Sequence, residues 1–101
     1  MLCALTVRKL KPGTMEDFKQ AFMPDDDMSN VPAGWKQFYA LRNVNDENEV
    51  ITFGLFEGTL EELRAGQEGG EYDQRRAAAD EFVESVGADG IFEVVENRSM
   101  S

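Results

Sequence analysis

The chain has 101 residues, with 20 acidic residues against 10 basic ones and a formal net charge of -10. This length predicts a single domain, expected over residues 1–97 with a polar tail over 98–101. The negative charge excludes nucleic acid and anionic membrane surfaces as expected partners. No residue is histidine and one is cysteine, which excludes histidine-based triads, histidine-ligated haem and an ordinary structural zinc site, so we expect no metal and no cofactor.

The single cysteine, Cys3, excludes a disulfide within the chain, so nothing requires an oxidising compartment. The apolar start runs directly into basic residues, which is the reverse of the order in a signal peptide. No apolar run approaches the length of a membrane-spanning helix. We therefore expect a cytoplasmic protein.

The first half of the chain predicts a strand, a helix and a second strand. Alternating apolar residues favour a strand over 2–10, and Pro12-Gly13 ends it. Thr14 is a candidate N-cap for a helix that runs to about Met23, before Pro24. Residues 25–34 form a loop by composition, and the aromatic segment 35–44 predicts the next strand.

The second half predicts a hairpin partner, two helical segments and a last strand. A turn over 45–48 leads into a strand over 49–57. Thr59 and Glu62 form a capping box that opens a short helix, which glycines interrupt. A longer helix is expected from about Tyr72 to Val86, with Gly87 as its C-terminal cap, and a final strand over 91–95. The order predicts an α+β, ferredoxin-like βαββαβ domain with a four-stranded antiparallel sheet and helices on one face.

Both faces of the predicted sheet are apolar. With simple alternation, one face of the hairpin collects Trp35, Tyr39, Leu41, Val50 and Phe56, and the other collects Phe38, Ala40, Val44, Ile51, Phe53 and Leu55. Strands that are apolar on both faces need cover on both faces, and the helices supply only one layer. We therefore predict a homodimer that pairs sheet against sheet. The sequence leaves open which face meets the helices and which meets the second copy.

The chain resembles the dimeric α/β-barrel superfamily and, within it, the antibiotic-biosynthesis-monooxygenase-like domains. Two segments carry the resemblance, residues 5–18 (LTVRKLKPGTMEDF) and residues 50–63 (VITFGLFEGTLEEL). The resemblance implies a ferredoxin-like fold, a dimer and a substrate pocket between sheet and helices. Many members carry a histidine at or just after the short helix, where this chain has Ala65-Gly66-Gln67. Haem-degrading members use a histidine as iron ligand and an asparagine on the first strand, whereas this chain has no histidine and has Thr6 at the corresponding first-strand position, so that route is not expected here.

Five residues are candidates for ligand binding: Trp35, Tyr39, Thr6, Arg42 and Tyr72. The aromatic residues would line a pocket or, alternatively, serve only in packing. Across the hairpin Tyr39 is expected near Gly54, with the register uncertain by one, and a glycine opposite a large ring makes room for that ring or for a ligand. Arg42 would hold an anionic group, or act as an edge-strand charge that discourages aggregation.

Two further features favour a structural reading. The acidic run at residues 25–27 lacks the spacing of a calcium-binding loop and is read as a solvated loop. Cys3 is read as a small buried residue, because no basic partner is evident.

Two functions remain open at this stage. The first is a non-catalytic dimer that binds a small apolar or aromatic molecule, which suits a chain without an evident catalytic constellation. The second is a cofactor-independent monooxygenase-like enzyme acting on a small aromatic or polyketide-like substrate. In the second case proton abstraction falls to a tyrosine, a carboxylate or water.

Overall fold

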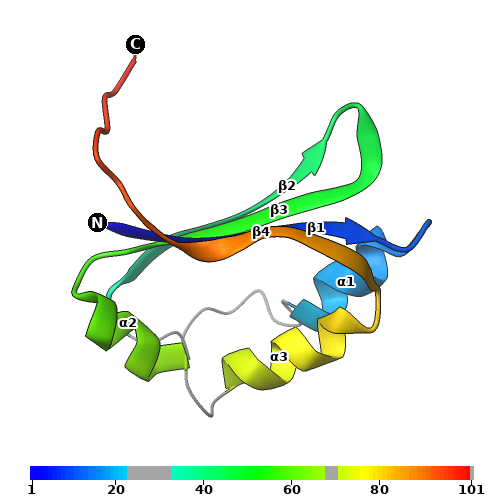
Figure 1. The fold of residues 1–101 in the computed structure, drawn as a ribbon, viewed down its shortest axis with the longest axis horizontal. Coiled ribbons are helices and arrows are strands. Elements are labelled where there is room, and N and C mark those ends of the chain that lie inside the picture. The colour runs from blue at the N-terminus through cyan, green and yellow to red at the C-terminus, as the bar shows by residue number, and fades with distance from the viewer. Residues whose placement is uncertain (23–32, 68–70, 101) are drawn as a thin grey trace.

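The computed structural model describes residues 1–22, 33–67 and 71–100, with the side chains of residues 67, 71 and 72 outside that description (Figure 1). The acidic run at residues 25–27 therefore lies outside the described residues. The elements in chain order are β1 (Leu2–Leu10), α1 (Met15–Phe22), β2 (Trp35–Asn43), β3 (Asp46–Phe56), α2 (Leu60–Gln67), α3 (Glu71–Asp80) and β4 (Val83–Glu93).

The four strands form one antiparallel sheet in the order β2-β3-β1-β4, and the three helices lie on one side of it (Figure 1). This is the ferredoxin-like α+β fold that the sequence predicts, with α2 added before the second main helix. One face of the sheet is thus covered by helices, and no helix or strand of the described residues covers the other.

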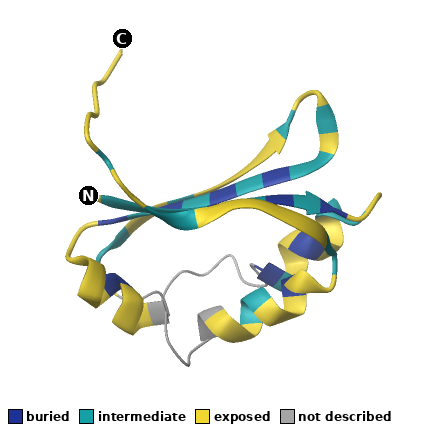
Figure 2. Cartoon of the chain, viewed as in Figure 1, coloured by how far each residue is buried: buried dark blue, intermediate teal, exposed yellow. Residues whose placement is uncertain are grey.

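The helix-covered side of the sheet, called the inner face, holds the core. It comprises the even positions of β1 and β3, which alternate with less buried odd positions in the manner of strands with one buried face (Figure 2). Its most buried members are Thr6, Arg8, Leu10, Val50, Thr52 and Phe56. Phe18 and Phe22 of α1 and Ala79 of α3 pack against this face.

The uncovered side, called the outer face, is also apolar. The strand register places the odd positions of β1 and β3 beside one another there, with Tyr39 next to Phe53 and Phe92 next to Cys3. The outer face comprises Cys3, Leu5, Val7, Tyr39, Leu41, Ile51, Phe53, Leu55 and Phe92. Tyr39 is 41% exposed, Leu41 44% and Phe92 49%.

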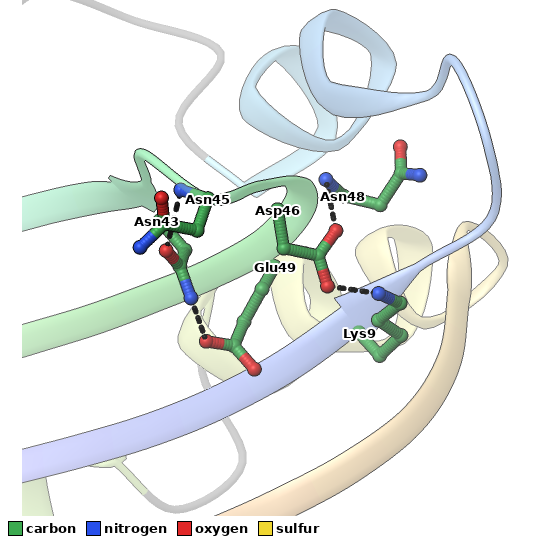
Figure 3. A network of polar contacts seen from close by, with 6 residues as sticks. All are labelled: Lys9, Asn43, Asn45, Asp46, Asn48 and Glu49. Carbon is green, nitrogen blue, oxygen red and sulfur yellow. Dashed lines mark hydrogen bonds and ion pairs between the residues drawn. The ribbon is translucent and has the colours of Figure 1, made fainter.

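The β2–β3 hairpin differs from the prediction in its turn. The turn is Val44-Asn45, two residues rather than four, and β3 begins at Asp46. Side chains hold it: Asn43 Oδ1 accepts from the Asn45 backbone N–H at 2.8 Å, Asp46 Oδ1 accepts from the Asn48 N–H at 3.1 Å, and Asp46 pairs with Lys9 of β1 (Figure 3). The Asn43 and Asp46 side chains thus accept hydrogen bonds from backbone N–H groups that a regular strand ladder would pair with carbonyl groups. The strand register shifts at the same place, between Arg42 and Asn43.

A second irregularity corrects the predicted faces of the hairpin. The register also shifts between Trp35 and Gln37, so one extra residue of β2 is inserted there. Trp35 consequently lies on the inner face with Phe38, whereas Tyr39 lies on the outer face. The prediction that Trp35 and Tyr39 share a face is wrong, because simple alternation does not hold across a bulge. Phe38, and not Tyr39, is paired with Gly54.

The last strand corrects the predicted long helix. Helix α3 ends at Asp80 instead of Val86, and Val83–Glu93 pairs with β1 along its length. The apolar residues from Phe82 to Val86 suit one face of a helix as well as a strand. The strand forms because it pairs with backbone N–H and C=O groups of β1 that would otherwise lack partners. Gly87 lies where the β4 register shifts opposite Val7, so the glycine marks a bulge and not a helix cap.

The two predicted helix starts also differ from each other. At α2 the capping box is confirmed, because the Glu62 N–H donates to Thr59 Oγ1 and the Thr59 N–H donates to Glu62 Oε1, both at 3.1 Å. At α1 the Thr14 hydroxyl instead donates to the Lys11 carbonyl at 2.7 Å, so it closes the preceding turn. Both starts place their helix against the inner face.

Candidate functional site

A cavity of about 320 Å³ lies between the inner face and the helices. All four strands and all three helices contribute residues to its wall. Its apolar wall includes Ala4, Phe22, Trp35, Phe38, Gly54, Leu60 and Ile91. Its polar wall includes Thr6, Thr52, Arg64, Arg76 and Asp89. This position agrees with the pocket that the sequence resemblance implies.

The aromatic part of the wall depends on one glycine. A Cβ atom at Gly54 would lie 2.7 Å from Cζ3 of Trp35, far inside contact distance, so the indole occupies the space that a side chain would need. Trp35 also packs edge-to-face on Phe56, with ring centroids 5.1 Å apart. A glycine opposite an aromatic ring was expected, but the ring belongs to Trp35 and not to Tyr39.

The polar part of the wall centres on Asp89 of β4. Thr6 Oγ1 donates to Asp89 Oδ1 at 3.0 Å, and an Arg76 Nη donates to Asp89 Oδ2 at 2.5 Å. Burial raises the pKa of Asp89, but the hydrogen bonds from Arg76 and Thr6 and the charges of Arg76 and Arg8 outweigh it, so this pKa lies below its ordinary value. Asp89 is therefore ionised at neutral pH and is held in place from two sides.

A buried arginine stands behind this wall. Arg8 is 1% exposed, and its Nη1 donates to Thr52 Oγ1 at 2.8 Å. Its guanidinium carbon lies 5.4 Å from the ring centroid of Phe18 and 5.1 Å from that of Phe22. The packed aromatic rings and the Thr52 hydroxyl thus hold a positive charge in the core.

The structure brings together two of the five candidates from the sequence. Trp35 and Thr6 line the cavity. Tyr39 lies on the outer face and stacks on Phe53, and Arg42 is exposed on β2, at the edge of the sheet. Tyr72 lies in α3, and its side chain lies outside the described residues.

Sequence reasoning missed Asp89, Arg76, Arg64 and the buried Arg8. Asp89 was missed because its segment was expected to be a cap and loop after a long helix. For Arg8 a signal existed, since it is the only charged residue at the even positions of β1, between Thr6 and Leu10. Cys3 lies on the outer face, and burial raises the pKa of its thiol, so it is protonated at neutral pH.

Within residues 1–22, 33–67 and 71–100, no group of three or more acidic or cysteine side chains is placed to hold a metal ion. No helix in that part of the chain is long and apolar enough to cross a membrane.

Comparison with known proteins shows likeness in structure. No protein-family model matches the sequence, and no curated protein sequence matches it either. Among solved structures, the oxygenase SnoaB of Streptomyces nogalater, described as cofactor-independent, aligns with a TM-score of 0.78 at 11% identity, covering 95% of this chain and 94% of that one. A protein from Nitrosomonas europaea, provisionally assigned as an antibiotic biosynthesis monooxygenase, aligns with a TM-score of 0.77 at 18% identity over 95% of this chain and all of that one.

A third structure, Rv0793 from Mycobacterium tuberculosis, aligns with a TM-score of 0.71 at 13% identity, covering 97% of this chain and 98% of that one. The chain has the fold of the antibiotic-biosynthesis-monooxygenase-like proteins. The expected family resemblance is therefore confirmed at the level of structure. At these identities the shared antibiotic-biosynthesis-monooxygenase-like fold fixes the scaffold and leaves the chemistry to the site.

Proposed function

We propose that this protein binds a small aromatic molecule in the cavity under the inner face. The carrying observation is the cavity itself, whose wall has an aromatic part around Trp35 and a polar part around Asp89. Its volume of about 320 Å³ falls at the lower end of the range of about 300–1,000 Å³ that is usual for small-molecule sites. An apolar wall with a few fixed polar groups is the composition that such sites use.

Calorimetric titration with naphthalene-2-carboxamide, a neutral planar aromatic, tests this proposal. We expect saturable binding with one site per chain. Trp35 is the only tryptophan of the chain and lines the cavity, so its fluorescence should change over the same ligand range. A matched pair of variants locates the site: Ala4→Leu fills the cavity wall, whereas Ala40→Leu adds the same atoms at an exposed position of β2. Binding that survives Ala4→Leu unchanged would contradict the proposal.

We also propose that the outer face is covered by a second copy of the chain. The centre of this face carries apolar side chains, although the chain as a whole has a charge of -10. Two strongly acidic chains repel each other except where such an uncharged surface lets them meet. An apolar face that is the same in both copies suits a two-fold contact.

A second function is favoured by Asp89. This ionised carboxylate lies in the cavity wall, where it can take a proton from an acidic O–H or C–H group of a bound substrate and leave the electron pair on that substrate. Because its pKa is lowered, it suits only substrates that are themselves acidic, such as polyphenols. Dioxygen would then accept the electrons of the substrate anion, which matches the printed description of SnoaB as a cofactor-independent oxygenase.

Oxygen uptake with a series of polyphenols tests this second function. Turnover should fall about a hundredfold in Asp89→Asn, because a general base is lost while the shape of the side chain is kept. Turnover that is unchanged in this variant would rule out Asp89 as the base. Ligand binding without any oxygen uptake would rule out the oxygenase function and leave the binding function as the only one of the two.

A further inference from the structure

The charge of the cavity is opposite to the charge of the chain. Acidic residues outnumber basic ones two to one in the sequence, 20 against 10. Among the described residues of the cavity wall, the ionisable side chains are Arg64, Arg76 and Asp89, so the cations are in excess. The buried Arg8 adds a further positive charge directly behind Thr52.

The arginines of this site are not equivalent. Arg76 is bound to Asp89, and the charge of Arg8 also acts on that carboxylate. One carboxylate therefore faces two guanidinium groups. Arg64 of α2 is exposed at the cavity wall, and within the described part of the chain no hydrogen bond or ion pair occupies it.

We infer that the ligand of this cavity is an aromatic anion, whose ring lies against Trp35 and Phe38 and whose oxyanion is bound by Arg64. This inference rests on the proposed binding function and adds the charge of the ligand to it. A guanidinium presents its N–H donors in a planar fork that matches a carboxylate. The excess positive charge at the wall attracts an anion into the cavity, although the rest of this acidic chain would repel that anion.

Two probes of nearly the same shape test the inference, naphthalene-2-carboxylate and naphthalene-2-carboxamide; the first is an anion, and in the second a neutral NH2 donor replaces one acceptor oxygen. Calorimetry at low ionic strength should give about tenfold tighter binding for the carboxylate, as expected for a charge-assisted hydrogen bond. Added salt should weaken the binding of the carboxylate and leave the binding of the carboxamide unchanged. Arg64→Gln should remove the preference, and Arg64→Lys should keep part of it, since a lysine retains the charge without the fork.

Arg98→Gln is the matched control, because it removes the same charge from an exposed residue of the tail that does not line the cavity. It should leave the preference for the carboxylate intact. Equal binding of the two probes to the native protein would overturn the inference and leave the binding function standing. Binding of neither probe would overturn both. A preference that persists in Arg64→Gln would overturn the role given to Arg64.

Discussion

The two faces of the sheet are nearly equal in apolar character and very different in cover. On the inner face, Leu10, Val50 and Phe56 are 0–3% exposed under the helices. On the outer face, Tyr39, Leu41 and Phe92 are 41–49% exposed. Figure 2 shows all three helices on one side of the sheet, and none of the described helices lies over the other side.

The two faces suit two different roles, ligand binding and contact with a second copy, which the alternation of the sequence alone does not assign to one face or the other. The inner face combines a packed core at the α1 and α3 end with a cavity and its polar wall, so it is the face to which we assign the proposed ligand site. The outer face carries polar side chains at its hairpin end, where Lys9 pairs with Asp46 and Asn43 donates to Glu49, and its apolar centre suits a contact with another sheet. The bulge at Trp35 and Gln37 is what divides the aromatic residues of β2 between these two roles.

The largest expected effect is in the core of the inner face. Phe18→Ala should lower the free energy of unfolding by about 3–5 kcal/mol, because it leaves a cavity among Leu10, Phe22 and Arg8. Urea denaturation followed by circular dichroism measures this change. The loss should be similar at every protein concentration, since Phe18 does not belong to the outer face. A loss below about 1 kcal/mol would contradict the assignment of the core.

The next effect concerns the outer face. Tyr39→Ala should weaken dimerisation by about 2 kcal/mol or more, as expected when an aromatic anchor of an interface is truncated. Sedimentation velocity over a dilution series measures it, and ligand binding in the cavity should be retained. Val95→Ala is the control, because Val95 is 89% exposed and lies outside the sheet, and it should leave the dimer unchanged. Loss of ligand binding with an intact dimer would reverse the roles of the two faces for Tyr39.

A smaller effect is expected where the inner face accommodates Trp35. Gly54→Ala should cost about 1–3 kcal/mol of stability, because the new methyl group would press into a rigid indole ring. The emission of Trp35 should shift as the ring moves. Gly87→Ala is the matched control in the same sheet, since its methyl group would lie 3.7 Å from the nearest atoms of Val7, an ordinary contact. Equal costs for both substitutions would show that the indole does not need the space at Gly54.

The smallest effect is a pH dependence at Asp89. Its folded-state pKa is lowered, so the stability that it contributes is fully present above its unfolded value of about 3.9 and is lost as pH falls through the folded value. The difference in free energy of unfolding between the native protein and Asp89→Asn should therefore be constant near neutral pH and shrink under acid. Arg76→Gln should reduce the same acid-dependent loss. A difference that grows on acidification would contradict the sign.

The fold was predictable because it follows from periodicity and turn chemistry. The alternation in β1 and β3 and the capping box at Thr59 and Glu62 are local signals, and the structure agrees with them. The two bulged strands were not predictable, since a bulge is an exception to alternation that depends on pairing with a neighbour. This placed Tyr39 wrongly beside Trp35 and put the start of β4, from Val83 to Val86, inside an expected helix.

The candidate site was predictable only in part. Thr6 and Trp35 were found because they stand out within strands, and both line the cavity. Asp89 and Arg76 come from segments 13 residues apart, and only the pairing of β4 with β1 brings Asp89 against Thr6. Contacts of this kind depend on the order in which the strands pair in the sheet, so no local pattern in the sequence predicts them.

The central claim is that a second copy covers the outer face while the helices cover the inner face. Sedimentation equilibrium of the native protein at micromolar concentration tests it most directly. The account predicts a particle of twice the 11.3 kDa mass of the chain, and a thermal unfolding midpoint that rises with protein concentration. A stable species of 11.3 kDa, with a midpoint independent of concentration, would contradict it, because the outer face would then be apolar and uncovered in solution.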